Sequence, residues 1–382
     1  MTDKYLIEPD VNFIKEIIGL GGDTLKKCFQ CATCSVVCPI SPDTKPFPRK
    51  EMIAASWGLK DRLVNNLDIW LCHHCGDCTT MCPRGAKPGE VLGAVRSYAI
   101  TEYAVPKVVG KWVNDPKMLP LIGFAVPVVI FLVLGLITGL LNFSPPLGEH
   151  GISHSMFFSS WLVDMIFVPL AGWVVVIFAM GLKRFINDIH GNAVLEGKTN
   201  KKELEFGGLI KGLLRVLPTI LKQDKFSECS ENKDRDVAHW MVFLSFIGLF
   251  IVTNIFFVAL YGLQLHGPYS QLNPVKWLAN ISGVALIIGS ILMIKNRLAK
   301  AKTDQTSSYQ DWYLLGLVLG LGVTGMFTEM SRLAGMAGVT YFMYFIHLVF
   351  VFNLFAFLPF SKLAHIVYRT VAMAYNEYSE RQ

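Results

Sequence analysis

Long apolar runs dominate the C-terminal two thirds of this chain of 382 residues. Each of six runs lacks Asp, Glu, Lys and Arg, and each approaches or exceeds the roughly 17–25 residues that a helix needs to cross a bilayer. Residues 118–382 are therefore predicted to form a membrane bundle of about six transmembrane helices. The runs are Leu119–Leu141, Met165–Leu182, Trp240–Leu265, Trp277–Ile294, Trp312–Thr328 and Leu333–Phe360.

Residues 1–117 show a different pattern, in which polar and charged residues interrupt the apolar positions. In the segment FPRKEMIAASWGLKDRLVNNLDIWLC, apolar residues such as Met52, Trp57 and Leu63 recur near helical spacing, and GEVLGAVRSYAITEYAV after Pro88 shows the same pattern. The Asn-Asp-Pro sequence at 114–116 marks the boundary with the membrane part. We predict a small helical soluble domain over residues 1–117 and an all-α fold for the whole chain.

The distribution of positive charge predicts the orientation in the membrane. All but two of the 35 Lys and Arg residues lie in the N-terminal segment, the loops Lys183–Ala238 and Lys295–Lys302, and the C-terminal tail. Six spans place these four segments on one side, which the positive-inside rule makes cytoplasmic. We expect a multi-pass protein of the cell inner membrane, with its N-terminal domain and C-terminus cytoplasmic and Asn142–Ser160 outside.

The composition agrees with a protein that contacts membrane lipid. Hydrophobic residues make up 52% of the chain, charged residues 17%, and the mean hydropathy is +0.43. Trp161, Trp240, Trp277 and Trp312 lie at the ends of runs, as interfacial anchors do. The net charge of +6 comes from the basic residues of the segments outside the apolar runs, so no nucleic-acid partner is expected. The first residues do not resemble a cleavable signal peptide.

One loop segment, FGGLIKGLLRVLPTILKQ at 206–223, is apolar with scattered Lys and Arg. Two interpretations are open at this point. The segment is either an amphipathic helix on the lipid surface or a helix docked on the cytoplasmic domain or on a partner protein.

Eight of the nine cysteines form two matching runs, each closed by a proline. The runs Cys28-x2-Cys31-x2-Cys34-x3-Cys38 and Cys72-x2-Cys75-x2-Cys78-x3-Cys82 have the spacing that holds [4Fe–4S] clusters in two-cluster ferredoxins. Three cysteines of such a run wrap one cluster while the fourth ligates the other. We therefore predict an α-helical ferredoxin domain in which cluster 1 is held by Cys28, Cys31, Cys34 and Cys82, and cluster 2 by Cys72, Cys75, Cys78 and Cys38.

Competing uses of these cysteines are weaker. A structural zinc site needs only four thiolates and has no use for the fourth Cys-Pro of each run. Disulfides require an oxidising compartment, whereas the charge distribution places this domain in the cytoplasm. His73 and His74, inside the second run, are expected to lie beside the cluster or at the surface, and Cys229 is not expected to be a ligand.

Histidines in the membrane part predict a second kind of cofactor. An ionisable residue inside a membrane helix is costly unless it has a role. His347 lies in the last run and His365 follows 18 residues later, which on one helix is five turns, a shared face and roughly 27 Å. This spacing suits a helix that ligates one b-type haem near each membrane surface, and His239, at the cytoplasmic start of the third span, is expected to pair with His365.

The partner of His347 has two candidates on the outer side. His154 precedes the second span and His266 follows the third. His154 is preferred because Gly267 and Pro268 make His266 resemble a turn residue. His150 is a weaker option and His190 lies on the wrong side, and the alternative for all of them is that they cap helices or lie at the interface.

Glu329 and Arg332, between the last two runs, form a further polar group on the outer side. A carboxylate near a haem would give a quinone head group a proton path. The alternative is an ordinary interfacial ion pair.

The motifs resemble known redox proteins. CFQCATCSVVCP and WLCHHCGDCTTMCPRGAKPGEV resemble the small iron–sulfur subunit of heterodisulfide reductases. NPVKWLANISGVALIIG and the last span, with His347 and His365, look like their cytochrome b subunit, and the 18-residue histidine pair also resembles the last helix of the nitrate reductase gamma subunit. The two parts in this order resemble the fused iron–sulfur and cytochrome b subunit of the quinone-interacting membrane-bound oxidoreductase complex of sulfate reducers.

That resemblance implies two b haems, menaquinol as the membrane partner, and cytoplasmic flavin and iron–sulfur subunits, with electrons passing on to adenylylsulfate reductase. One departure matters. The nitrate reductase gamma subunit has two histidines on an early helix, whereas here Leu249 follows His239 by ten residues, so a chain with one haem stays an alternative.

The sequence thus predicts a membrane electron-transfer subunit that is inactive without its partners, with no catalytic residue of its own identified. Two alternatives stay open: a heterodisulfide- or sulfite-reductase-linked redox subunit, and a haem-free iron–sulfur membrane anchor. A transporter is disfavoured because the runs carry few charges and no clear inverted repeat.

Overall fold

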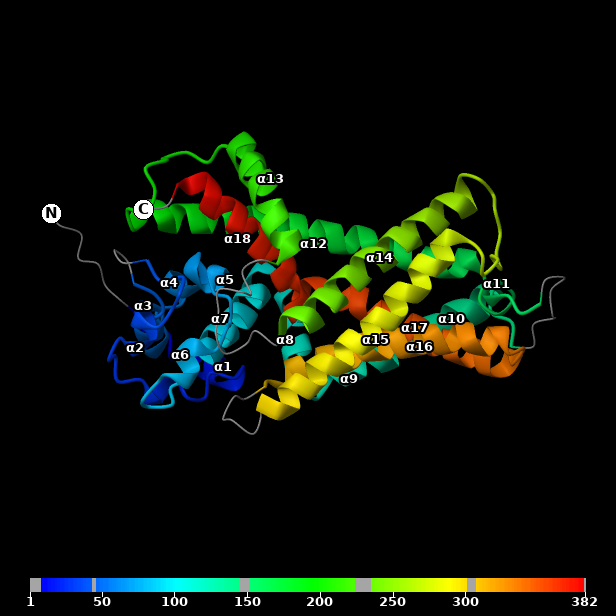
Figure 1. Cartoon of the computed structure of the whole chain (residues 1–382), viewed down its shortest axis with the longest axis horizontal. Coiled ribbons are helices and arrows are strands. Elements are labelled where there is room, and N and C mark those ends of the chain that lie inside the picture. The colour runs from blue at the N-terminus through cyan, green and yellow to red at the C-terminus, as the bar shows by residue number, and fades with distance from the viewer. Residues whose placement is uncertain (1–7, 43–45, 144–150, 224–234, 301–306, 381–382) are drawn as a thin grey trace.

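The computed structural model describes residues 8–42, 46–143, 151–223, 235–300 and 307–380. Within those ranges helices are joined by loops, and there is no β-strand, only an isolated antiparallel bridge between Leu141 and Phe158. Short helices gather at one end of the molecule and long helices at the other (Figure 1). The predicted all-α fold is confirmed.

Short helices build the N-terminal part. Asp10 caps the first helix by accepting a hydrogen bond from the Phe13 N–H at 3.0 Å. Pro88 begins α7, where its missing N–H costs no hydrogen bond, and α7 contacts α1, α3, α4, α5 and α6. The elements are α1 (Val11–Gly19), η1 (Leu25–Lys27), α2 (Thr33–Val36), α3 (Arg49–Ser56), α4 (Lys60–Val64), α5 (Asp68–Leu71), α6 (Asp77–Thr80), α7 (Pro88–Tyr103) and α8 (Lys107–Asn114).

Six helices in the described ranges are long and apolar enough to cross a membrane, which confirms the predicted number of spans. The first span, Met118–Thr138, is composite and contains a short π-helical segment. Its parts are α9 (Met118–Pro120), η2 (Leu121–Ala125) and α10 (Val126–Thr138). The others are α12 (Ser160–Leu195), preceded by the single turn α11 (His154–Phe157), and α14 (Arg235–Tyr261), α15 (Pro274–Lys300), α16 (Tyr309–Leu333) and α17 (Ala337–Phe357).

The second span extends further than the sequence indicates. Its apolar run ends before Lys183, but α12 has 36 residues and is therefore about 54 Å long, against roughly 30 Å of hydrocarbon. Lysine is a good helix former, so the charge ends the apolar run without ending the helix. The extension enters the N-terminal part, where Phe185, Ile189 and Ala193 are buried.

The last span requires a correction. α17 ends at Phe357, and two short turns, η5 (Leu358–Phe360) and η6 (Lys362–Ala364), separate it from α18 (His365–Ser379). Ser361 between the turns is extended, with φ −98° and ψ 173°, and Pro359 has no N–H for a continuing helix. The prediction that His347 and His365 share one face of one helix is therefore wrong.

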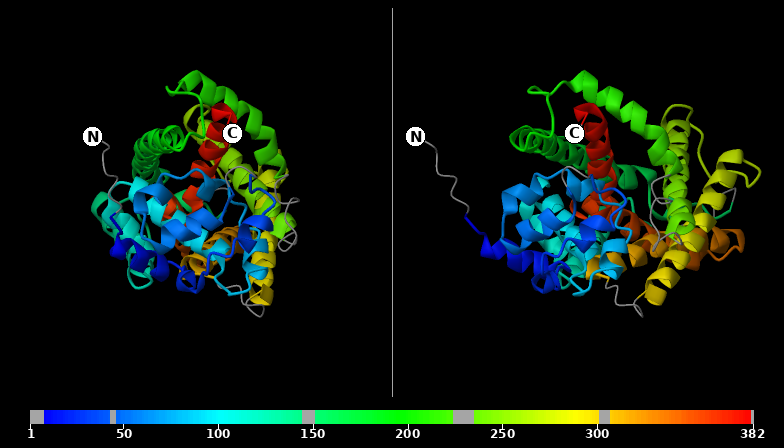
Figure 2. Two further views of the ribbon diagram at one scale, coloured as in Figure 1. Left: turned by 90° about the vertical axis from the view of Figure 1, so that its left-hand side faces the viewer. Right: turned by 60° about the vertical axis from the view of Figure 1, so that its left-hand side comes forward.

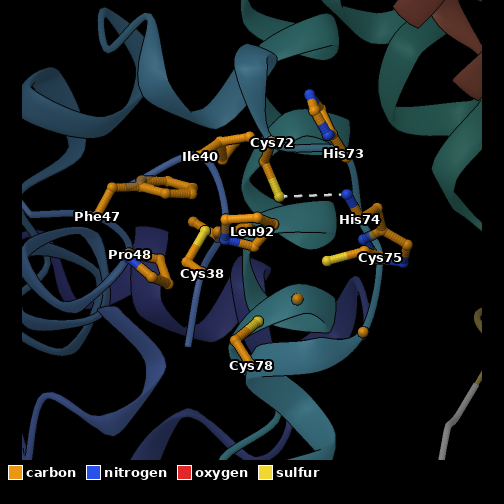
Figure 3. A pocket seen from close by; sticks show the side chains of 13 residues that line it. Cys38, Ile40, Phe47, Pro48, Cys72, His73, His74, Cys75, Cys78 and Leu92 are labelled. Carbon is orange, nitrogen blue, oxygen red and sulfur yellow. Dashed lines mark hydrogen bonds between the residues drawn. The ribbon is translucent and has the colours of Figure 1, made fainter. Parts of the chain in front are cut away.

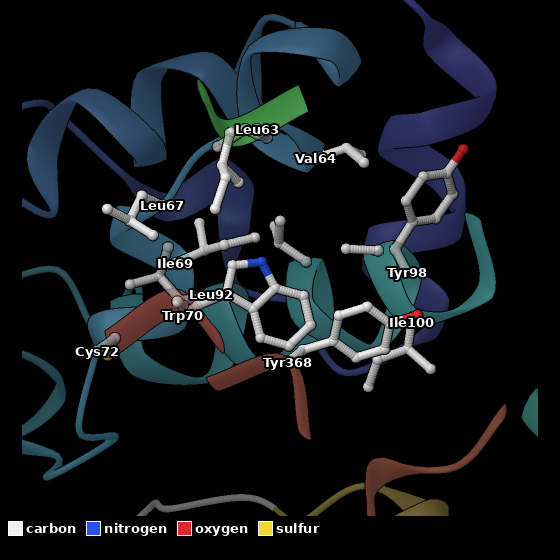
Figure 4. Packing of buried hydrophobic residues seen from close by; sticks show 14 of the residues in the cluster. Leu63, Val64, Leu67, Ile69, Trp70, Cys72, Leu92, Tyr98, Ile100 and Tyr368 are labelled. Carbon is white, nitrogen blue, oxygen red and sulfur yellow. The ribbon is translucent and has the colours of Figure 1, made fainter. Parts of the chain in front are cut away.

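α18 completes the core of the N-terminal part. The ring of Tyr368 lies 5.2 Å from that of Trp70 and 5.3 Å from that of Phe185 (Figure 4). Tyr375, two turns further along α18, is also fully buried. Figure 2 shows α18, in red, beside the N-terminal helices, so one continuous core joins these helices, the extension of α12 and α18. The core thus crosses the sequence boundary predicted at residue 117.

Tyr368→Ala is expected to destabilise the N-terminal part by about 3–5 kcal/mol, the usual cost of deleting a large buried aromatic ring. Thermal loss of the iron–sulfur absorbance of the whole chain would report it as a lower midpoint. Tyr309→Ala, which removes an exposed ring, is the matched control. Equal midpoints for the two variants would contradict a shared core.

The amphipathic segment forms α13 (Phe206–Lys222), which docks on α18 through small residues. Gly212 leaves room for the Ala374 carbonyl, and Gly208 for the ring of Tyr378. The large apolar side chains of α13 lie on the opposite face and are exposed: Phe206, Ile210, Leu214, Leu217 and Leu221. One face of the helix is therefore docked on α18, while its apolar face stays uncovered by the residues that the structure describes.

A buried polar cluster joins α3, α5 and the end of α12. The Glu51 side chain is fully buried; its Oε1 accepts a hydrogen bond from Asn66 at 3.1 Å, and its Oε2 has no partner. Asp68 lies 3.2 Å from the Nζ atoms of both Lys50 and Lys198. Burial and the nearby Asp68 carboxylate raise the pKa of Glu51 to about 7.

The raised pKa of Glu51 predicts that the N-terminal part loses stability as the pH rises. Because the folded pKa lies above the unfolded one, the stabilisation is fully present below pH 4.5 and is lost as the pH rises through about 7. The loss is on the order of 3 kcal/mol. Glu51→Gln should therefore melt higher than the unmodified chain at pH 8 and similarly at pH 5. Parallel pH curves for the two proteins would contradict this, and exposed Glu16→Gln is the control.

Candidate electron-transfer site

The four cysteines predicted to hold cluster 2 converge. Cys38, Cys72, Cys75 and Cys78 line one pocket, and Figure 3 shows their sulfur atoms pointing into the same space. Burial, with Cys72 and Cys75 nearby, raises the pKa of the Cys38 thiol to about 12. The same causes raise the pKa of Cys78. A buried group of thiols is stable only when it stays protonated or when a positive centre replaces the protons, and iron supplies such a centre.

The four cysteines predicted to hold cluster 1 are also neighbours. Burial, together with Cys28, Cys31 and Cys82, raises the pKa of the Cys34 thiol to about 11. The group therefore combines three cysteines of the first run with the last cysteine of the second run. Cys31 is its exposed member.

The loops around these sulfur atoms contain residues in the left-handed backbone conformation. Gln30, Ala32 and His74 adopt left-handed backbone angles, with φ of 62°, 69° and 53°. The N–H of His74 donates to Cys72 Sγ and that of Ala86 to Cys82 Sγ, each at 3.4 Å. Hydrogen bonds to ligand sulfurs are among the features that set the reduction potential of an iron–sulfur cluster.

In the part of the chain that the structure describes, no three His, Cys, Asp or Glu side chains lie close enough to hold one metal ion. A [4Fe–4S] cluster differs from a single ion in that it binds each thiolate to a different iron atom.

Two arginines connect cluster 2 to the histidine-bearing helix α18. Arg96 Nη1 on α7 and Arg369 Nη1 on α18 both donate to the carbonyl oxygen of Cys72 at 3.3 Å. Arg96 Nη2 also lies 3.2 Å from Nδ1 of His74, so His74 lies beside the pocket, as expected. Arg369 is one helical turn after His365 and therefore shares its face.

His365 and His239 come together at the end of the bundle that adjoins the N-terminal part. Burial and the charges of Arg96, His239 and Arg369 lower the pKa of His365 to about 3, which keeps its imidazole neutral. Its Nδ1 contacts the Lys362 carbonyl, and Nδ1 of His239 donates to Gln223 Oε1 at 3.1 Å. In each ring the hydrogen bond places the proton on Nδ1, which leaves the lone pair on Nε2, as a metal-ligating histidine requires.

His347 and His154 are neighbours at the outer end. Thr324 Oγ1 donates to the Gly320 carbonyl at 2.6 Å and so accepts from Nδ1 of His347 at 2.9 Å. His154 acts electrostatically on His347, and its own Nε2 is buried without a hydrogen-bond partner. A Cβ on Gly325 would lie 3.1 Å from the His347 ring, so this glycine makes room for the imidazole.

The remaining described histidines, His266 and His190, lie in different surroundings. His266 is exposed, and its Nδ1 bonds the Gln264 carbonyl at 2.9 Å, which favours His154 as the partner of His347. His190 is buried on the extension of α12 and bonds the Tyr375 hydroxyl at 2.9 Å, a structural role. His150 and Cys229 lie outside the described residues.

Glu329 belongs to an ion-pair network at the outer end. Its Oε1 lies 2.9 Å from Lys276 Nζ and 2.8 Å from Arg332 Nη2, and the three side chains are largely buried. Gln271 also donates to Glu329. Burial, with Arg332 and Lys276 nearby, lowers the pKa of His154 to about 4. Glu329 and Arg332 thus form an ion pair, and the network lies near His154.

A cavity of about 310 Å³ lies between the N-terminal part and the cytoplasmic ends of α15 and α16. His74, Gly89 and Gly93 form one wall. Arg297 and Lys362 form the other, each paired with Asp311, at 3.3 Å and 2.9 Å. The cavity is thus polar and adjoins the second cysteine run.

Sequence comparisons agree with the cysteine geometry. Residues 24–86 match the 4Fe-4S dicluster domain. The C subunit of the H(2):CoB-CoM heterodisulfide,ferredoxin reductase of Methanothermobacter marburgensis is 37% identical over 90 residues, which are 24% of this chain and 49% of that protein. A protein of Archaeoglobus profundus, described as similar to the C subunit of heterodisulfide reductase, is 37% identical over 94 residues, 24% of this chain and 50% of that protein. This chain thus spans about half the length of these relatives.

A more distant similarity reaches the succinate dehydrogenase iron–sulfur subunit of Candida glabrata, 29% identical over 87 residues, 19% of this chain and 34% of that protein. No solved structure matches. The comparisons and the helices together describe a redox protein with a 4Fe–4S dicluster domain and a multi-pass membrane part.

Several residues around the site carried no recognisable sequence motif. Gln223 and Thr324 orient histidines from other helices, and Arg96 reaches Cys72 from 24 positions away. Only Arg369 carried a local signal, because it lies four residues after His365 on a helical segment.

Proposed function

We propose that this chain is the membrane electron-transfer subunit of a quinone oxidoreductase complex. In this role it passes electrons between menaquinol, haem b and two [4Fe–4S] clusters to cytoplasmic flavin and iron–sulfur subunits, and on to adenylylsulfate reductase in sulfate respiration. The observation that carries the proposal is the hydrogen bond that Arg369 donates to the Cys72 carbonyl at 3.3 Å. Arg369 lies on α18, the helix that begins with His365. One helix thus supports both cofactor types.

The residues divide into ligands and positioning groups. Cys28, Cys31, Cys34 and Cys82 would hold cluster 1, and Cys38, Cys72, Cys75 and Cys78 cluster 2. His239 and His365 would hold an inner haem b, and His154 and His347 an outer one. When bound, these groups supply one-electron transfer.

The chain's own groups orient these ligands. Thr324 and Gln223 fix the ring orientation of His347 and His239 through Nδ1. The N–H donors of His74 and Ala86 favour the negatively charged sulfur atoms of Cys72 and Cys82. Lys276, Arg332 and Glu329 line the region where a quinol head group near the outer haem would release its protons. This region is on the side of the membrane opposite the cytoplasmic domain.

A second function has a specific observation in its favour. The relatives named above are described as heterodisulfide reductase proteins, so a membrane subunit linked to a heterodisulfide-reductase-type partner is the alternative. The two proposed functions differ in the soluble protein that exchanges electrons with this chain. They do not differ in the electron transfer within the membrane. Assaying quinol-dependent reduction of adenylylsulfate reductase, with the complete complex, separates them.

The deciding experiment is a visible spectrum of the purified full-length chain, oxidised and then reduced with a menaquinol analogue, with haem quantified as pyridine haemochrome. A b-type spectrum with about two haems per chain, reducible by the quinol, is the expected result. A content of one haem per chain would show that either the inner or the outer histidine pair binds no haem. No haem would overturn the proposal and leave the iron–sulfur membrane anchor.

A further inference from the structure

The two cysteine groups have different surroundings. Cluster 2's ligand Cys72 is buried and is bound through its carbonyl by α18. Cluster 1's ligand Cys31 is exposed, on the loop before α2. In Figure 1, α2 lies at the left-hand end of the molecule, away from α10, α14, α16 and α17. Cluster 1 is therefore the site that a soluble protein can approach.

Apolar side chains are exposed around the cluster 1 ligands. Phe29 lies between Cys28 and Cys31 and is 67% exposed, and Val36 lies between Cys34 and Cys38 and is 84% exposed. Met81, next to Cys82, is 59% exposed. Three large apolar residues beside one cofactor site, supplied by both cysteine runs, favour a covered interface over open solvent.

The charged side chains that contact these residues are basic. The guanidinium of Arg84 lies 3.9 Å from the ring centre of Phe29. Arg49 donates through Nε to the Gln30 carbonyl at 3.1 Å and acts electrostatically on Cys31. The stretches 24–42 and 78–89, which carry the cluster 1 ligands, contain Lys and Arg but no Asp or Glu, and acidic residues stand only at their outer edges, at Asp23, Asp43, Asp77 and Glu90. We call Phe29, Val36, Met81, Arg49 and Arg84 the cluster 1 surface.

We propose that the cluster 1 surface docks an acidic face of a soluble redox protein, which exchanges electrons with this chain there. The inference rests on the proposed function and adds the docking site and the sign of the partner's charge. A lipid surface does not fit, because the long apolar helices lie at the other end (Figure 1). A second copy of this chain does not fit, because it would bring like charges together. Whichever protein is oxidised loses the electron that the other gains.

The test uses the full-length chain in lipid nanodiscs and, as probe, a small acidic flavoprotein of the flavodoxin class. Binding is measured by surface plasmon resonance at low and high salt. We expect the affinity to fall as salt rises and the double variant Arg49→Glu/Arg84→Glu to bind at least tenfold more weakly at low salt. Phe29→Ser should weaken binding through faster dissociation, with less effect on the salt dependence.

The matched control is Lys15→Glu/Lys111→Glu, which makes the same charge change at exposed lysines on α1 and α8. Equal weakening by both double variants, or no weakening by the first, would overturn the proposal. A chain that forms dimers broken only by Arg49→Glu/Arg84→Glu would also overturn it, in favour of self-association.

Iron content and the cluster spectrum of each variant show whether its clusters are intact. If Arg84→Glu disturbs them, Arg49→Glu alone and the milder Arg84→Ser replace it. The haem spectrum and quinol reduction are recorded on the same samples. Failure of the proposed function appears there, whereas failure of the docking proposal appears only in the binding data.

Discussion

Cys82→Ala is expected to abolish the same [4Fe–4S] cluster as Cys31→Ala, although the two residues belong to different cysteine runs. The reason is that Cys82, with Cys28 and Cys31, surrounds Cys34, whereas Cys38 faces Cys72 and Cys75. Each variant should lower the iron content from roughly eight to roughly four atoms per chain. The double variant should lose no more than either single one.

Electron paramagnetic resonance of the reduced chain identifies which cluster is lost. Cys38→Ala should match Cys75→Ala, and not Cys31→Ala. Replacing the ninth cysteine, Cys229→Ala, should leave the iron content unchanged. If Cys82→Ala instead lost the signal that Cys75→Ala loses, each run would hold its own cluster and the exchange of the fourth ligand would be wrong.

His365→Ala is expected to remove one haem and leave the cluster iron unchanged. His239→Ala should remove the same haem, because its ring is one of the groups that act on His365. His154→Ala and His347→Ala should together define the other haem. Each variant should reduce the haem content from about two to about one per chain, measured as pyridine haemochrome.

The matched control is His266→Ala, on the outer side like His154 but exposed and bonded to its own loop. It should keep the full haem content. Haem loss in His266→Ala with none in His154→Ala would reassign the outer ligand. No haem loss in any of the four histidine variants would remove both haem sites.

Features set by local spacing could be predicted from the sequence. The 4Fe–4S dicluster domain could be predicted because the intervals within each cysteine run match the geometry of a cluster, and residues 24–86 match that domain. The six spans were predictable because bilayer thickness imposes a length on an apolar run. His154 was preferred over His266 from the Gly267-Pro268 turn, and the burial of His154 Nε2 supports that choice.

Features that depend on distant contacts were not predictable. The break after Phe357 was missed although Pro359 is visible, since proline in an apolar run also fits a kinked helix. α12 extends past Lys183 because its C-terminal end packs on helices that lie 80 or more positions earlier in the sequence. The contact between Arg184 and Tyr103 is an example. No pattern in one sequence reveals that Arg96 and Arg369 converge on one carbonyl.

The burial of Tyr368 and Tyr375 in the core of the N-terminal part has a consequence for biosynthesis. α18 is synthesised after all six spans, so the domain that holds the clusters cannot close its core until membrane insertion is essentially finished. A chain that ends before α18 would lack the rings of Tyr368 and Tyr375 and would leave the core of the cluster-binding part open.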